Sequence, residues 1–112
     1  MKIWVDDIRP APPGYFWVKS VNEAIAYIQE YSNYLDFDMN RVQAIELIDM
    51  DHDAGNYTCF GGDYIKILEW MELQQKYGDI YMRTIPIRIH SMNPVGIQNM
   101  RAIIQRNGWK EV

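Results

Sequence analysis

The feature that most constrains the fold is a mostly apolar run, residues 42–48, followed at once by an acidic segment, residues 49–55. The first five residues of that segment hold three carboxylates and an imidazole. A buried strand rarely carries such charges unless they are paired or bind a metal. In open α/β sheets the ligand crevice lies outside the carboxyl ends of the strands. The pattern therefore predicts a central parallel strand whose carboxyl end opens onto a functional site.

Two other stretches of the chain end in the same way. Residues 2–5 lead into Asp6 and Asp7, and residues 84–89 lead into His90. Because the carboxyl ends of parallel strands meet at one edge of a sheet, we expect these side chains and the acidic segment to form one composite site.

The rest of the chain alternates strands with helices. Strands are predicted at residues 2–5, 15–18, 42–48 and 84–89, with a short fifth edge strand at 109–112. Helices are predicted after the capping box of Ser20 and Glu23, from Asp63, and after the pair Asn93-Pro94. This alternation predicts a single domain, residues 1–112, with a three-layer α/β/α fold and a mostly parallel sheet. The composite site requires the strand order 2-1-3-4, with the fifth strand beyond the fourth.

Composition excludes several classes of protein. The net charge is −4 and Lys and Arg form no block, which argues against an extended nucleic-acid surface or binding to an anionic membrane. No apolar run approaches the ~20 residues of a membrane span. The single cysteine, Cys59, has no partner for an internal disulfide, so we expect a cytoplasmic protein.

Asp6, Asp7 and Asp51 supply hard oxygen ligands at two predicted strand ends. Such ligands suit Mg²⁺ or Mn²⁺ better than zinc. An isolated pair of acids more often caps a helix or binds water in a loop. The second acidic strand end favours a divalent-cation site over that alternative.

His52 and His90 are the only histidines, and both lie at predicted strand ends. Their unperturbed pKa lies near working pH, so with Asp51 they are the candidate catalytic groups, as general acid and base. A lone histidine is more often a hydrogen-bonded structural residue. Because both histidines are expected at one cluster, a catalytic role is favoured over a structural one. Two histidines with an aspartate also suit zinc or iron, and the sequence leaves that alternative open.

Asn93 and Pro94 begin a helix whose free N–H groups and positive dipole end face the same crevice. Such a terminus is a natural phosphate site, although capping alone also explains Asn93. Arg9, just past the acidic pair, either binds a phosphate or pairs with Asp7. Ser91 lacks the sequence context of a hydrolase nucleophile, so we assign it no such role.

Four motifs, read together, resemble one known family. They are residues 6–12 (DDIRPAP), 50–55 (MDHDAG), 61–63 (GGD) and 90–96 (HSMNPVG). In this order they resemble the cyclic-phosphate processing receiver-like domain, and their framework spans nearly the whole chain. The resemblance implies a receiver-like (flavodoxin-like) sheet and an acidic metal site at Asp6, Asp7 and Asp51. It also implies a phosphate surrounded by His52, His90, Ser91 and Asn93.

The chain departs from the family pattern at several points. Ala54 stands where the family usually has Leu, and Asp49 is an additional acid. A proline-rich loop replaces the helix that a full receiver carries between its first two strands. The lysine that ends a receiver's last strand has no counterpart, since Lys110 lies in a four-residue tail. The missing lysine disfavours ordinary signalling, because in a receiver that lysine senses the phosphorylated aspartate.

These observations predict a metal-dependent phosphoesterase that acts on a cyclic phosphate, either a 2′,3′-cyclic end of RNA or a cyclic nucleotide. The candidate phosphate- and substrate-binding residues are Arg9, Asp53, Ser91 and Asn93. One alternative is a stand-alone signalling receiver that is phosphorylated on Asp51. Another is a non-catalytic module that binds a phosphorylated ligand or a protein.

Overall fold

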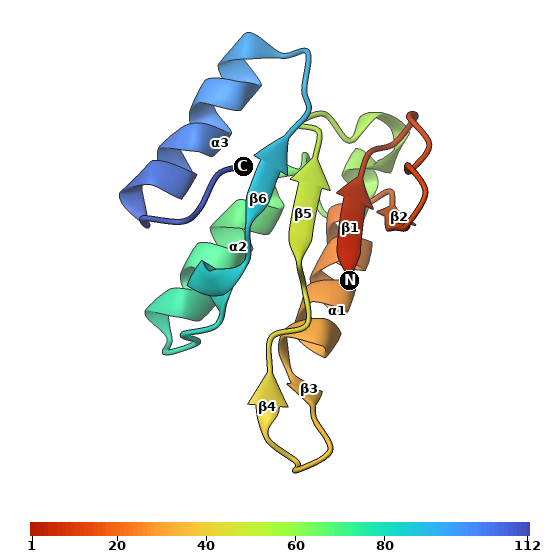
Figure 1. The fold of residues 1–112 in the computed structure, drawn as a ribbon. Coiled ribbons are helices and arrows are strands. Elements are labelled where there is room, and N and C mark those ends of the chain that lie inside the picture. The colour runs from red at the N-terminus through yellow and green to blue at the C-terminus, as the bar shows by residue number, and fades with distance from the viewer.

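The computed structural model describes all 112 residues and has an α/β fold with a four-stranded parallel sheet. The strands of the sheet are β1 (Lys2–Val5), β2 (Tyr15–Val18), β5 (Leu47–Met50) and β6 (Ile87–Ile89). They lie in the order β2-β1-β5-β6, so β1 and β5 are central (Figure 1). The predicted receiver-like parallel sheet is therefore confirmed.

Three helices follow the strands as the sequence predicts. They are α1 (Val21–Ser32), α2 (Ile65–Lys76) and α3 (Pro94–Arg106), with short 3₁₀ helices η1 (Gly55–Phe60) and η2 (Met82–Thr84) in the connections. Two predicted caps are present: Ser20 Oγ accepts from the Glu23 N–H at 3.1 Å, and Asn93 Oδ1 accepts from the Gly96 N–H at 3.0 Å. None of the helices has the length and apolar character needed to cross a membrane.

One face of the sheet forms the hydrophobic core. Strand residues alternate between the two faces, so Ile3 and Val5 of β1 and Ile48 and Met50 of β5 point the same way. These side chains are buried in a single cluster together with the apolar side chains of α1, α2 and α3. In Figure 1, α1 and α2 lie behind the sheet and α3 lies beside β6.

The opposite face of the sheet is not covered by a helix, and we call it the open face. Its strand residues include Lys2, Trp4, Tyr15, Trp17, Asp49 and Arg88. The fold therefore has two layers where three were predicted. The missing layer is explained by the connection from β1 to β2, which is too short and too rich in proline to form the helix that would cover this face.

The strand order differs in detail from the predicted 2-1-3-4-5. Two unpredicted strands, β3 (Tyr34–Leu35) and β4 (Arg41–Val42), form a separate antiparallel hairpin that projects away from the sheet (Figure 1). The predicted fifth strand is reduced to one bridge between Ile87 and Glu111. Because residues 41–42 belong to the hairpin, the central strand begins later than predicted, at Leu47, and Asp49 lies inside it.

Candidate functional site

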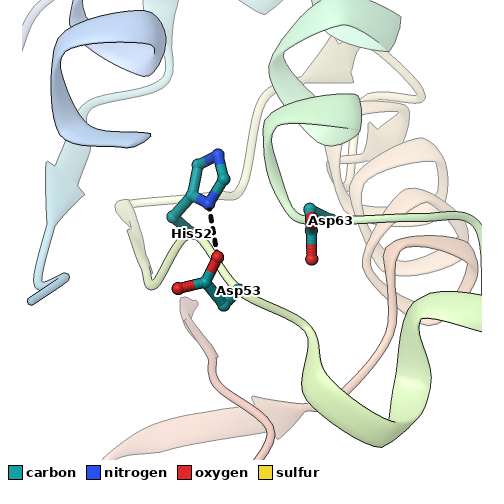
Figure 2. Close-up of side chains that lie close together, drawn as sticks. All are labelled: His52, Asp53 and Asp63. Atoms are coloured by element: carbon teal, nitrogen blue, oxygen red, sulfur yellow. Dashed lines mark hydrogen bonds and ion pairs between the residues drawn. The ribbon is translucent and has the colours of Figure 1, made fainter. Parts of the chain in front are cut away.

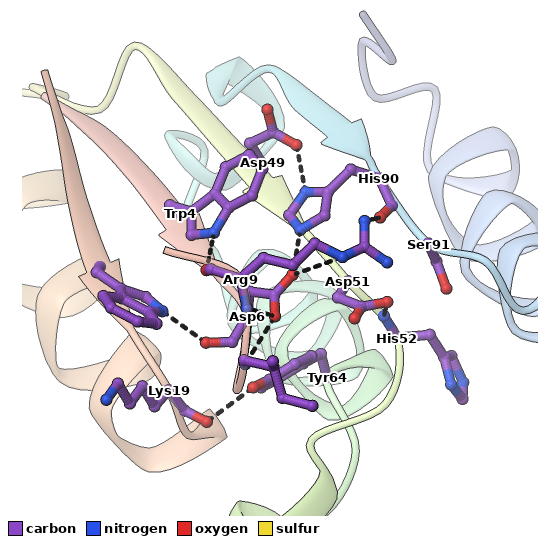
Figure 3. A network of polar contacts seen from close by, with 12 residues as sticks. Trp4, Asp6, Arg9, Lys19, Asp49, Asp51, His52, Tyr64, His90 and Ser91 are labelled. Atoms are coloured by element: carbon purple, nitrogen blue, oxygen red, sulfur yellow. Dashed lines mark hydrogen bonds and ion pairs between the residues drawn. The ribbon is translucent and has the colours of Figure 1, made fainter. Parts of the chain in front are cut away.

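The carboxyl ends of β1 and β5 bring three acids together. The backbones of Asp6 and Asp51 extend the hydrogen bonding between neighbouring strands by one residue. The Asp6 N–H donates to Val18 O at 3.2 Å, and the Asp51 N–H donates to Val5 O at 2.9 Å. Carboxylate oxygens of Asp6, Asp7 and Asp51 lie within 4.8 Å of one another. The structure thus assembles the predicted acidic cluster at one end of the sheet, and Figure 3 shows two of its members, Asp6 and Asp51.

The three acids differ in their environment. Asp6 is 1% exposed. Burial opposes its ionisation, but hydrogen bonds from the backbone N–H groups of Arg9 and Ile8, and from His90, outweigh burial and lower the pKa of Asp6. The pKa of Asp7 is raised by burial and by repulsion from Asp6 and Asp51. The cluster therefore concentrates negative charge that a cation would neutralise.

His90 lies between two carboxylates. Its Nδ1 is 2.6 Å from Asp49 Oδ1, and its Nε2 is 2.9 Å from Asp6 Oδ2 (Figure 3). The indole of Trp4 stacks on the imidazole, with ring centroids 3.8 Å apart. Burial disfavours the imidazolium, but the hydrogen bonds to Asp49 and Asp6 outweigh that effect and raise the pKa of His90. Both ring nitrogens are thus occupied by carboxylates of the protein.

Arg9 lies on the same side of the acidic cluster as His90. Its Nη1 donates to the backbone oxygen of His90 at 3.2 Å, and its Nε is 3.9 Å from Asp6 Oδ2. The acid beside its guanidinium is therefore Asp6, and no ion pair with Asp7 forms. About half of the Arg9 side chain stays exposed, which leaves donors free for an anion.

His52 is held differently from His90 (Figure 2). Its Nδ1 is 2.8 Å from Asp53 Oδ1, and its Nε2 makes no hydrogen bond within the protein. The ring packs against the first turn of α3, where a Cβ at Gly96 would lie 2.5 Å from His52 Cγ. His52 therefore has a fixed ring with one free nitrogen, which is the arrangement that proton transfer requires.

Asp53 and Asn93 connect His52 to the N-terminus of α3. Asn93 Nδ2 donates to both oxygens of Asp53 at 3.4 and 3.5 Å, while Asn93 Oδ1 caps the helix. Ser91 Oγ accepts from the Asn93 N–H at 3.1 Å, so Ser91 orders the turn before the helix. The predicted phosphate-binding residues Asp53, Ser91 and Asn93 thus lie together at this terminus.

Three residues near the site carry roles that the sequence analysis did not assign. Asp49 binds His90 Nδ1. The one sequence feature that pointed to Asp49 is that it adds an acid to the family pattern. Asp63 joins His52 and Asp53 in a second group whose ligand atoms lie within 4.8 Å of one another (Figure 2). Tyr64 is fully buried and donates its hydroxyl to Lys19 O at 2.8 Å. Burial and the negative charge of Asp7 raise the pKa of Tyr64, which keeps its hydroxyl a donor.

Comparison with known families identifies the family of this chain. The model of the cyclic-phosphate processing receiver domain matches residues 1–106. The chain belongs to this family. No curated protein and no solved structure shows significant similarity to this cyclic-phosphate processing receiver domain. Its four-stranded parallel sheet and three helices are consistent with a receiver-like fold.

The acidic cluster of this receiver domain fits a hard divalent cation. All its donors are carboxylate oxygens. Burial, together with repulsion from the neighbouring carboxylates, raises the pKa of Asp7, and a bound cation would offset that repulsion. The second group, with His52, Asp53 and Asp63, offers one nitrogen and two oxygens, a mixed set that matches the zinc alternative better.

Proposed function

We propose that this receiver domain is a metal-dependent phosphoesterase that opens a cyclic phosphate. The observation that carries the proposal is the convergence of Asp6, Asp7 and Asp51, joined through the backbone N–H of His52, whose ring has one nitrogen bonded to Asp53 and the other free. The family is named for cyclic-phosphate processing, which supplies the class of substrate.

Asp6, Asp7 and Asp51 would hold a cation of the Mg²⁺ or Mn²⁺ class. When bound, such an ion polarises a phosphoryl oxygen and lowers the pKa of a bound water. The protein's own contribution is to keep the three oxygens together. Backbone N–H groups hold Asp6 from one side, and the His52 N–H donates to Asp51 Oδ1 at 2.7 Å.

His52 is the residue we assign to proton transfer. A water oxygen forms a bond to phosphorus, and the bond from phosphorus to one ribose oxygen breaks. The leaving oxygen takes the proton of His52 Nε2, and the water proton passes to solvent, from which His52 is reprotonated. The product is a phosphomonoester, so atoms and charge balance. Asp53 orients the imidazole through Nδ1 throughout.

His90 takes a different part in this proposal from the acid–base role that the sequence suggested. Because Asp49 and Asp6 occupy both of its nitrogens, His90 positions Asp6 within the acidic cluster. The anion is bound by Arg9 and by the α3 N-terminus, where Ser91 and Asn93 order the backbone.

A screen of cyclic phosphates with and without Mg²⁺ or Mn²⁺, followed by phosphorus NMR of the product, tests the proposal. We expect metal-dependent conversion of a cyclic phosphodiester to a phosphomonoester. His52→Gln should lower the rate by roughly 10²–10⁴-fold and leave metal affinity nearly unchanged. Loss of metal binding together with activity would instead make His52 a ligand, as the zinc alternative requires.

Acetyl phosphate separates this function from signalling. A signalling receiver should gain a stable phosphoryl mass increment at Asp51 that Asp51→Asn loses. The enzyme should turn over its substrate and keep no adduct. Stoichiometric, long-lived labelling without hydrolysis of any cyclic phosphate would refute the proposed function.

A further inference from the structure

The open face carries aromatic rings where a covered sheet would carry aliphatic side chains. Tyr15 and Trp17 of β2 lie in register with Lys2 and Trp4 of β1, so all four point to this face. Trp17 is 36% exposed, and Trp4 packs edge-on against Tyr15 with centroids 5.9 Å apart. Aromatic side chains on an exposed sheet are platforms on which unpaired nucleobases stack.

Basic side chains surround these rings. Lys2 Nζ lies 5.5 Å from the Tyr15 centroid and Lys19 Nζ lies 4.3 Å from the Trp17 centroid. Arg9 and Arg88 lie on the side toward β6, where each is only loosely paired, at 3.9 and 3.6 Å from its nearest acid. Four of the eleven basic residues therefore gather at a face whose only acidic strand residue, Asp49, is buried.

The remaining basic residues are arranged differently. Of the seven others, four pair with an acid at 3.0 Å or less: Arg41, Lys66, Arg101 and Arg106. The other three, Lys76, Arg83 and Lys110, form no salt bridge but do not gather on the open face. The net charge of −4 thus conceals a group of four basic side chains on one face, which can attract an anion. A covering helix is a poor occupant, because it would bury Lys2 without an acidic partner and Arg88 with only the 3.6 Å contact to Asp49.

We propose that the open face binds a short stretch of single-stranded RNA. Bases stack on Tyr15 and Trp17, and phosphates pair with Lys2, Lys19, Arg9 and Arg88. The surface is only a few strand residues long, so it fits a few nucleotides and is no extended nucleic-acid surface.

The face leads directly to the acidic cluster. The Trp17 indole donates to Asp6 O at 2.7 Å, and the Trp4 indole donates to Arg9 O at 2.8 Å (Figure 3). A strand lying on Tyr15 and Trp17 therefore has its end beside Asp6 and Arg9. This step rests on the proposed function: the substrate is then the 2′,3′-cyclic end of an RNA chain, because only ribose carries the 2′-hydroxyl that closes such a ring.

Fluorescence anisotropy in the absence of divalent metal tests binding separately from turnover. The probe is a fluorescein-labelled single-stranded RNA of about six nucleotides, within the usual site size of small single-strand binders. Tyr15→Leu should weaken binding roughly 5–150-fold, the loss expected for one stacked base. Lys2→Gln should reduce the slope of log K against log salt by about 0.7, the release of one counterion from a single strand.

Two matched controls lie outside the face. Phe16→Leu changes an aromatic residue of the same strand that points to the opposite face, and Lys66→Gln removes a lysine from α2; both should bind RNA like the parent. Equal losses in Phe16→Leu and Tyr15→Leu would overturn the inference. If Tyr15→Leu does not fold, the slope of log K against log salt is compared between Lys2→Gln and Lys66→Gln. A smaller slope in Lys2→Gln alone supports the inference, and equal slopes overturn it.

Two further measurements separate the possible failures. Absence of RNA binding by the parent overturns the inference, whatever the turnover of cyclic phosphates. RNA binding without any turnover supports the inference and refutes the proposed function. A concentration-dependent dimer in sedimentation that Tyr15→Leu abolishes would make the face a self-association surface and overturn the RNA assignment.

Discussion

Asp49→Ala should be among the most destabilising single substitutions in this protein. Asp49 and His90 meet at 2.6 Å with side chains 4% and 13% exposed, so the bond is short, charge-assisted and largely shielded from water. Losing such a bond costs about 1.5–3 kcal/mol, and leaving the His90 N–H buried and unpaired costs about 1–3 kcal/mol more. We therefore expect the free energy of unfolding to fall by roughly 2.5–6 kcal/mol.

Asp49→Asn separates charge from hydrogen bonding. The amide can still bond His90 Nδ1, so only the difference between a charged and a neutral hydrogen bond is lost, about 1 kcal/mol. Urea unfolding of the metal-free protein, followed by tryptophan fluorescence, measures both variants. Glu46→Gln is the control, since its side chain is 67% exposed, and should change stability by less than about 0.5 kcal/mol. Equal costs for Asn and Ala, or a cost below about 1 kcal/mol for Ala, would refute this account of the His90 site.

Three other expectations can be measured. Asp51→Asn relieves repulsion among the acids, so by calorimetric titration it should bind Mg²⁺ more weakly while the metal-free protein is as stable or more stable; unchanged affinity would exclude the acidic cluster as a cation site. Gly96→Ala should displace the His52 ring and lower turnover by about tenfold or more, with metal affinity retained; parental turnover would refute the packing argument. Hydrogen bonds from Arg106 and Asn107 lower the pKa of Glu72 to about 2 from an ordinary value of 4.5. Because this pKa is depressed on folding, its stabilisation is present above pH 4.5 and lost as pH falls toward 2. The surface position limits it to about 1 kcal/mol, and Glu72→Gln should remove that part of the acid dependence of unfolding.

The sequence located the strand ends better than the strands. Polar residues that follow apolar ones mark where a strand leaves the core, and that signal placed Asp6, Asp51 and His90 at one edge of the sheet. Caps at Ser20 and Asn93 were equally local, because each depends on residues within three positions along the chain. Such features need no knowledge of the tertiary structure.

The role of Asp49 was not accessible in the same way. The run 42–48 contains enough apolar residues to be read as one strand, but Arg41 and Val42 pair with the hairpin partner instead. That pairing moves the central strand onward and places Asp49 within it, opposite Arg88. Only the register between β5 and β6 brings Asp49 to His90, and register between distant strands is not encoded in local periodicity.

The two-layer arrangement did leave a trace in the sequence. Lys2 and Trp4 alternate with Ile3 and Val5, and Arg88 stands between two isoleucines. A strand covered on both faces reads as nearly continuous apolar sequence, whereas this alternation is typical of a strand with one face in solvent. The apolar run at residues 42–48 shows no clear alternation, and it led to the prediction of a sheet covered on both faces.

The β3–β4 hairpin offers a site for attaching probes. Its tip, which includes the fully exposed Phe37, lies apart from the acidic cluster, and none of its residues belongs to the hydrophobic core cluster. Chain segments of this kind tolerate insertions and new termini well. A fluorophore or an affinity tag placed between Asp36 and Asn40 would report on RNA and metal binding from a distance. The same tip is a natural point at which to open the chain in a circular permutant, whose original chain ends are joined by a linker.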